Sequence, residues 1–149
     1  MAIARGAGTE IIRSASFYDI SNSTNTKLLI GEQHHIYTIL TIAIYCISNV
    51  TPFTIQGTLN SWDADNSAAA DIILFKNTIA AGQTFIWDNK ISFNGTHPTG
   101  MSGTLDSTTK QNLIADQASS TANYFWLDTG SNSDSCNAFV TYIDQNNNV

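Results

Sequence analysis

Short runs of alternating apolar and polar residues recur along the chain, and turn-forming residues separate them. This two-residue period is typical of β-strands that bury one face. The strands predicted in this way span residues 10–20, 27–30, 36–47, 53–62, 72–75, 84–87, 91–93, 124–127 and 139–143. The sequence therefore predicts an all-β protein, a single-domain β-sandwich or jelly roll with at most one short helix.

Residues 104–118 are the one region whose pattern fits either a strand or a short helix. Leu105, Leu113 and Ile114 supply apolar positions, and Ser107 is a suitable N-cap for a helix. We expect any helix in the protein to lie between Thr104 and Gln117.

The most apolar run in the chain, residues 36–47, has apolar side chains at both odd and even positions. Because Ile, Thr and Tyr dominate it, the run favours a strand over a helix. Apolar residues on both faces predict a central strand that is covered on both sides. The run is also too short to span a bilayer as a helix.

The stretch Asp71–Gly95 organises the rest of the predicted fold. A β-branched and aromatic run at 72–75 is followed by the turn residues Ala80–Gln83 and by a second strand at 84–87. A third strand follows at 91–93. The pattern predicts a hairpin and a further strand that present a sheet edge and loop tips, and it brings no nucleophile next to a base.

Charged residues make up only 12% of the 149 residues, so Ser, Thr, Asn and Gln must supply most of the polar surface. Low charge favours a protein that functions in an assembled state. The net charge of −6 and the scattered cations argue against binding to nucleic acid, which requires clustered Lys and Arg. The same charge argues against binding to an anionic membrane surface.

The chain divides into three predicted segments. Residues 1–8 are rich in Ala and Gly and form an N-terminal arm, residues 9–144 form the β-sandwich domain, and residues 145–149 form a polar C-terminal tail. The loop 63–70 is expected to precede the organising stretch. Met1 and Ile3 are the only large apolar residues of the arm, so we expect it to reach a neighbouring subunit.

No cluster of residues predicts catalysis, a cofactor or a metal ion. The Asp-rich segment 63–67 resembles a calcium loop, but Ala68 and Leu74 occupy the positions of the required Gly and bidentate Glu. His34 and His35 are adjacent on a strand and point to opposite faces, which disfavours joint chelation. Nearly all acidic residues lie in predicted turns, where solvation is the default. We expect a non-enzymatic protein without a cofactor.

The aromatic residues allow an alternative function, and the two cysteines allow a prediction of their redox state. Trp62, Trp87 and Trp126, with five tyrosines, allow an alternative function as a carbohydrate-binding module or adhesin whose aromatic rings stack on a glycan. Core or interface roles are the commoner ones for such residues. Cys46 and Cys136 are expected to be reduced and at least partly buried, because a domain of this size needs no disulfide.

Two segments of the organising stretch resemble a pattern in small structural proteins of tailed bacteriophages. The matching residues are IAAGQTF at 79–85 and DNKISF at 88–93, followed by Asn94-Gly95, and the strand 138–143 resembles the closing strand of that family. The resemblance implies a virion protein, most simply a capsid decoration (cement) protein, with a tail or head–tail connector component as the alternative. Its implied partners are further copies of itself as a homo-oligomer and the major capsid protein or tail proteins.

The segment 96–103 is longer than a hairpin requires and is rich in Gly, Pro and polar residues. We expect this loop to be exposed and to contact a neighbouring subunit or the capsid. Together with the arm it supplies the predicted interface residues, which are Met1, Ile3, Arg5, His97, Pro98, Thr99 and Met101.

Overall fold

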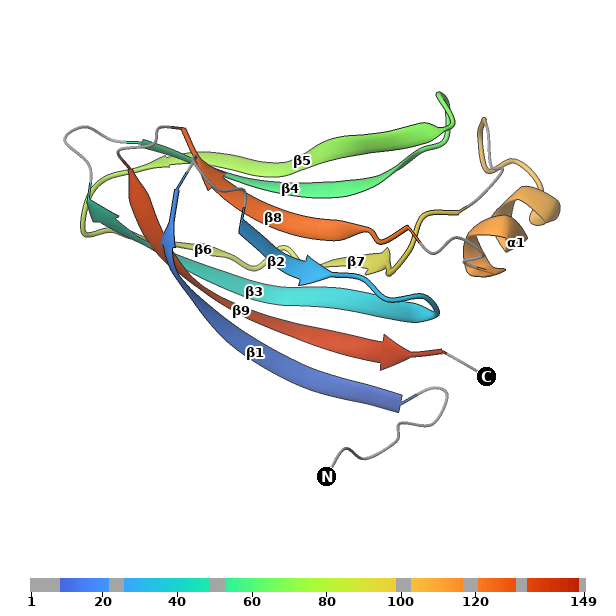
Figure 1. The fold of residues 1–149 in the computed structure, drawn as a ribbon, viewed down its shortest axis with the longest axis horizontal. Helices are drawn as coiled ribbons and strands as arrows, with labels where there is room; N and C mark the ends of the chain where they lie inside the picture. The colour runs from blue at the N-terminus through green and yellow to red at the C-terminus, as the bar shows by residue number, and fades with distance from the viewer. Residues whose placement is uncertain are drawn as a thin grey trace.

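The computed structural model describes residues 9–21, 26–48, 53–98, 103–116, 121–130 and 134–147. Two antiparallel sheets face each other (Figure 1). One has the strand order β1-β9-β3-β6, with β7 also paired to β3, and the other has the order β2-β8-β4-β5. The predicted all-β sandwich with one short helix is confirmed. The elements are β1 (Thr9–Ile20), β2 (Thr26–Ile30), β3 (His35–Ser48), β4 (Phe53–Asp63), β5 (Ala68–Ile79), β6 (Thr84–Trp87), β7 (Ile91–Asn94), α1 (Thr108–Asp116), β8 (Tyr124–Thr129) and β9 (Ser135–Asn146).

The core lies between the two sheets and consists mainly of aliphatic side chains. Ile39, Ile42 and Ile44 of β3 are completely buried, as are Phe125 and Leu127 of β8. Burying such side chains is worth about 1.5–3 kcal/mol each, so this layer supplies most of the stability of the sandwich.

A bulge in β3 corrects the predicted orientation of this central strand. The register with β9 shifts between Ile39 and Thr41. An extra residue at this point returns later side chains to the opposite face. Consequently Ile39 and Ile42 both point into the core, whereas Tyr45 is 45% exposed. The second face of β3 is therefore not fully covered by the part of the chain that the structure describes, contrary to the prediction.

The organising stretch forms its three strands, but the first two do not form a hairpin. β5 pairs with β4 in one sheet, whereas β6 pairs with β3 in the other. The turn between them, at 80–83, is confirmed: the Gln83 amide donates to the Ala80 carbonyl at 3.1 Å, and Gly82 has a φ of 78°. This turn crosses from one sheet to the other, so the hairpin expected here is wrong.

Half of the predicted loop 63–70 is strand. β4 and β5 pair in register down to Asp63 opposite Ala68, which leaves only a short turn between them. The Asp63 carboxylate accepts hydrogen bonds from the backbone amides of Asp65 and Asn66, at 2.9 and 3.4 Å, and from the Asn66 side chain at 2.6 Å. Asp63 thus stabilises this hairpin turn.

The helix α1 lies within the predicted window, and its N-cap is confirmed. The Ser107 hydroxyl accepts from the Lys110 amide at 3.3 Å, and the Ser107 carbonyl accepts from the Gln111 amide at 3.1 Å.

Near the C-terminus, β9 continues to Asn146, two residues beyond the predicted domain boundary at 144. These polar residues pair with β1 and β3 and so belong to the sheet.

A close backbone crossing joins the two sheets at the α1 end of the sandwich. The Gly31 amide donates to the Asn123 carbonyl at 2.8 Å, and the Asn123 amide donates to the Gly95 carbonyl at 2.9 Å. A Cβ atom at Gly95 would overlap the carbonyl oxygen of Glu32. Only glycine allows these two segments to approach so closely.

Candidate functional site

The outer face of the β1-β9-β3-β6 sheet, on the side away from the core, is the first candidate surface. Directly paired residues share a face of a sheet, so the register identifies its members. One row across the strands is Ser16, Phe139, Ala43 and Ile86. The neighbouring rows contain Ser14 with Thr141, Asn137 with Tyr45 and Thr84, and Ile12 with Ile143 and Thr38. We call these residues, together with Tyr18, the outer face.

Large apolar side chains protrude from the outer face. Ile12 is 69% exposed, Ile86 60% and Phe139 47%. Tyr18, Tyr45 and Phe139 surround a hollow of about 300 Å³ on this face. Exposed apolar groups gathered on one face of a sheet are typical of a protein interaction site.

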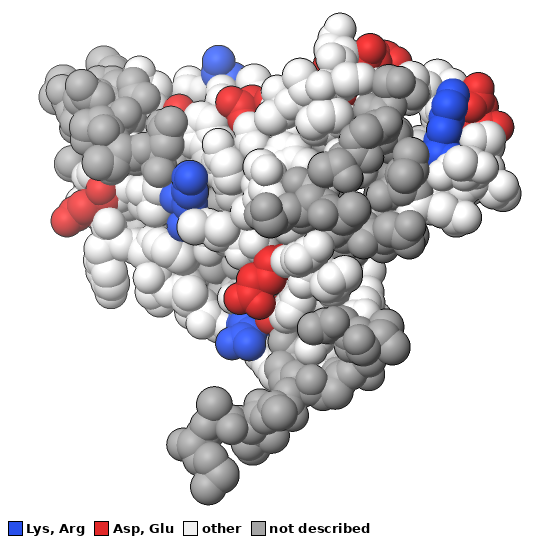
Figure 2. Space-filling model, turned by 45° about the vertical axis from the view of Figure 1, so that its right-hand side comes forward, with Lys and Arg blue, Asp and Glu red and all other residues white. Residues whose placement is uncertain are grey.

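None of these residues is charged, although the chain has a net charge of −6. The next row on the same side of the sheet contains the carboxylate of Glu10, opposite Gln145, and lies at the border of the outer face. Ser14 and Thr141 contribute hydroxyls that lie 3.3 Å apart. Figure 2 shows that, on the side it displays, charged side chains occur singly or in small groups separated by uncharged areas. A surface of this kind can be buried in an interface without desolvating an ionised group.

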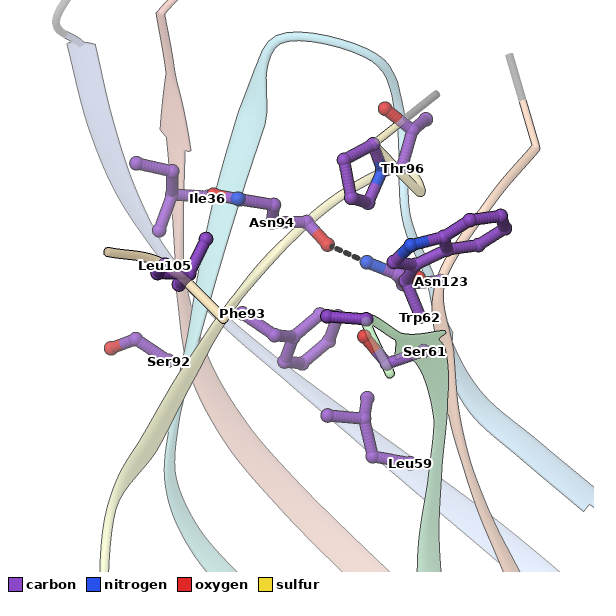
Figure 3. A pocket seen from close by; sticks show the side chains of 12 residues that line it. Ile36, Leu59, Ser61, Trp62, Ser92, Phe93, Asn94, Thr96, Leu105 and Asn123 are labelled. Carbon is purple, nitrogen blue, oxygen red and sulfur yellow. Dashed lines mark hydrogen bonds between the residues drawn. The ribbon is translucent and has the colours of Figure 1, made fainter. Parts of the chain in front are cut away.

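The second candidate is a pocket of about 390 Å³ at the α1 end of the sandwich, which we call the end pocket (Figure 3). Its lining comes from both sheets and from the segment before α1. The described lining residues are Ile36, Leu59, Ser61, Trp62, Ala64, Ser92, Phe93, Asn94, Thr96, Pro98, Leu105 and Asn123. The Asn123 side-chain amide donates to the Asn94 carbonyl at 2.7 Å. This bond joins the residue before β8 to the last residue of β7, which lies in the other sheet.

The beginning of segment 96–103 lies beside the end pocket and corrects the prediction of an exposed loop. Thr96 and His97 are only 2% and 3% exposed, and Pro98 is buried as well. Thr96 forms an isolated bridge with Ala122, and the His97 amide donates to the Thr121 carbonyl at 2.9 Å. This pairing satisfies backbone groups of the segment, whereas the Thr96 hydroxyl is buried without a hydrogen-bond partner in the described structure.

Protonation of His97 is disfavoured in the folded state. Burial lowers the pKa of its imidazole, and a backbone hydrogen bond with Ala122 offsets this only in part. The ring of Trp62 meets it edge-on, with 5.9 Å between ring centroids. The unfolded chain takes up a proton near the ordinary histidine pKa of about 6.5, whereas the folded chain resists it.

Replacement of His97 by Gln should therefore make stability less sensitive to pH. A depressed folded pKa contributes stability that is present above the unfolded pKa and is lost as the pH falls below it. Across about pH 5–8, we expect wild-type protein to lose more stability on acidification than His97→Gln. Urea unfolding at several pH values measures both slopes, and equal slopes would contradict the prediction.

A buried ionic network lies at the same end of the β1-β9-β3-β6 sheet. Asp144 is 5% exposed, and its carboxylate accepts from His35 Nδ1 at 2.7 Å and from Arg13 Nε at 3.3 Å. His35 Nε2 lies 3.5 Å from the Glu32 carboxylate. Burial, followed by the nearby Asp144, raises the pKa of Tyr37. The network links three strands of one sheet.

The sequence pattern did not predict this network, because it places nearly all acidic residues in solvated turns. Asp144 follows the predicted strand 139–143, and continuing the alternation by one residue would have indicated its inward direction. His35 is held between two carboxylates, with neither ring nitrogen directed at a hydroxyl or thiol in the contacts described. We interpret the network as a structural link between strands.

The tryptophans and cysteines occupy separate places. Trp87 is buried against Phe75, Trp62 lines the end pocket, and Trp126 lies on the outside of β8, so the three form no joint platform.

Cys46 and Cys136 are paired across β3 and β9, and both thiols are free and buried, in agreement with the prediction. Burial raises the pKa of Cys136 to about 12, which makes the reactive thiolate scarce at neutral pH.

Five predicted interface residues, Met1, Ile3, Arg5, Thr99 and Met101, lie outside the described residues. Their predicted contacts remain predictions, and His97 and Pro98 are not available on the surface of the single subunit. Among the described residues, no group of three or more His, Cys, Asp or Glu side chains is arranged to hold a metal ion. No helix in the described part of the chain is long and apolar enough to cross a membrane.

No protein-family model matches the chain, and no curated protein matches it either. Solved structures with a related arrangement include a pilus subunit of Bacillus endospore appendages, with 10% identity, a TM-score of 0.46, and coverage of 99% of this chain and 97% of that one. The CBM22-1–GH10 modules of a Clostridium thermocellum xylanase, solved with xylohexaose, share 13% identity over 87% of this chain and 21% of theirs, with a TM-score of 0.45.

A protein of the infectious bursal disease virus particle is also similar, with 9% identity over 98% of this chain and 37% of its own, and a TM-score of 0.43. This chain spans less than half of the xylanase and viral chains that it matches. These neighbours include structural proteins of assemblies and a carbohydrate-binding module. At such low identities and TM-scores the likenesses assign no function, and any function must be argued from the surfaces described above.

Proposed function

We propose that this protein is a non-enzymatic structural subunit that assembles with further copies of itself through the outer face of the β1-β9-β3-β6 sheet. The observation that supports this most directly is the uncharged row of Ser16, Phe139, Ala43 and Ile86 across the four strands. Its isoleucine and phenylalanine are about half exposed in the single subunit. Covering them removes apolar surface from water, at about 25 cal/mol for each Å².

A second copy is the occupant that best suits this surface. Two copies with net charge −6 repel each other, and this repulsion is weakest where no acidic side chain has to be buried. The hydroxyls of Ser14 and Thr141 and the amide of Asn137 can exchange neutral hydrogen bonds with the same groups of a neighbour. The bulge in β3 turns Tyr45 to this side, where it remains 45% exposed.

Within this class we propose a virion protein of a tailed bacteriophage, specifically a capsid decoration protein that binds the major capsid protein. The support is the sequence resemblance at 79–85 and 88–93. It is limited by the finding that the turn at 80–83 links two sheets, since the resembling pattern implies a hairpin. A tail or head–tail connector component is the alternative. Mass spectrometry of purified virions, followed by localisation in the intact particle, tests this assignment.

The substitution Ile86→Glu should disrupt self-association while leaving the fold intact. Ile86 is 60% exposed, so the change costs little inside the subunit, but a buried glutamate would lose its hydration and face a second one. We expect the dissociation constant to rise by about 100-fold, which is about 2.7 kcal/mol. Analytical ultracentrifugation over a range of concentrations measures it.

Ile73→Glu is the matched control, because Ile73 is 55% exposed and lies on the other sheet, paired with Thr58 of β4. It makes the same chemical change and should leave association unaltered. A wild-type protein that stays monomeric at all concentrations would refute assembly through this face. Equal weakening by both substitutions would instead place the contact elsewhere, for example at the long edge strands β1 and β5.

A further inference from the structure

The end pocket has the size and lining of a small-molecule site rather than of a packing defect. Its volume of about 390 Å³ lies within the range of about 300–1,000 Å³ usual for ligand pockets. Leu59 of β4 and Phe93 of β7 contribute from opposite sheets, and Leu105 contributes from the segment before α1 (Figure 3). Pro98 contributes from the segment after β7.

Backbone hydrogen bonds connect the segments around this pocket. The backbone hydrogen bonds among Gly31, Asn123 and Gly95 join the two sheets beside it. The Gly103 amide also donates to the carbonyl of Ala64 at 2.6 Å, which ties the segment before α1 to the β4–β5 turn. A pocket connected in this way is formed before a ligand binds, so binding would cost little conformational entropy in its lining residues.

The polar groups of the pocket define the ligand chemistry. None of the described lining residues is charged, so an ionised ligand would lose hydration without gaining a partner. The Ser61 hydroxyl and the Asn94 side-chain amide have no hydrogen-bond partner in the described part of the chain and are partly exposed. In the walls, Thr96 Oγ1 and Asn123 Oδ1 are buried without a partner in the described structure. Buried polar atoms without a hydrogen-bond partner are uncommon in protein interiors.

We propose that the end pocket binds a neutral saccharide. A pyranose ring combines an apolar C–H face with hydroxyl groups on its edge, which matches apolar walls that carry a few neutral donors and acceptors. Trp62 and Phe93 provide the aromatic surface, and Ser61 and Asn94 provide the hydrogen bonds. The pocket lining includes none of the residues named as the outer face. Saccharide binding and self-association can therefore be tested separately, and either can fail without the other.

The test uses the full chain labelled with ¹⁵N and titrated with D-glucose, D-galactose, N-acetyl-D-glucosamine and maltose as neutral probes. We expect at least one of them to shift the resonances of Trp62, Ser61 and Asn94, while D-glucuronic acid shifts none of them. Ser61→Leu, which replaces a hydroxyl by a larger apolar group, should weaken that binding by about tenfold or more.

Ala64→Met is a second variant that fills the pocket from the β4–β5 turn, and it serves where Ser61→Leu does not fold. Ala80→Met makes the same change at a turn that does not line the pocket and should leave binding unaltered. The proposal is overturned if no neutral probe shifts these resonances. It is equally overturned if binding persists in both pocket-filling variants, or if D-glucuronic acid binds as well as the neutral probes.

Discussion

Gly95→Ala should be among the most damaging single substitutions in this protein. The added methyl group would overlap the backbone of Glu32, and backbone atoms cannot move aside as the end of a side chain can. Relief requires separating the segment after β7 from the segment after β2, which strains the hydrogen bonds through Asn123. Because overpacking costs about 1–3 kcal/mol even where side chains yield, we expect a loss of about 3 kcal/mol or more in the free energy of unfolding.

Urea unfolding followed by tryptophan fluorescence measures this loss as a lower midpoint. The matched control is Gly130→Ala, because a Cβ there would meet only Thr54, with its nearest atoms at 3.7 Å. That variant should retain a midpoint close to the wild-type value. A Gly95→Ala protein as stable as Gly130→Ala would show that the two segments separate easily.

Asp144→Ala should be the second strongly destabilising change. It removes the carboxylate that accepts from His35 and Arg13, and it leaves these donors facing a cavity in the sheet. Removing one partner of a fully buried ion pair costs about 3–5 kcal/mol, but the Arg13 side chain is 47% exposed and water can solvate it. We therefore expect a loss of about 2 kcal/mol, measured by thermal or urea unfolding.

Asp106→Ala provides the comparison, since it also deletes an aspartate that is paired with a cation. Its partner Lys110 lies 2.8 Å away on the exposed side of the α1 segment, where such pairs contribute little. Asp144→Asn should fall between the two, because it keeps the shape and loses the charge. Equal midpoints for the Asp144→Ala and Asp106→Ala proteins would mean that the network does not stabilise the sheet.

Much of the strand content could be predicted from the sequence because side-chain alternation is a local property. The strands around 10–20, 27–30 and 53–62, the turn at 80–83 and the N-cap at Ser107 each depend on residues close together in the chain. The low charge likewise pointed to a surface made of neutral polar and apolar groups. These features follow from propensity, period and composition, which need no knowledge of the partner strands.

The candidate surfaces depended on contacts between distant residues. One bulge, near Leu40, decides which side chains of β3 enter the core and which join the outer face. The alternation in 72–75 and 84–87 is compatible either with a hairpin or with strands in two separate sheets. In the folded protein the two strands lie in different sheets, and Phe75 packs across the core against Phe85 and Trp87.

Burial of His97 and Asp144, two residues whose polarity suggested exposure, was decided by tertiary structure alone. Thr121 and Ala122 pair with the segment that contains His97, and His35 and Arg13 contact the Asp144 carboxylate from neighbouring strands. The Asp144 carboxylate is buried because partners replace water around it, whereas His97 is held inside by the backbone pairing of its segment and by contact with the Trp62 ring. Those partners lie as far as 131 residues away in the chain, so the sequence determined which segments form strands, and the long-range pairing determined which side chains meet.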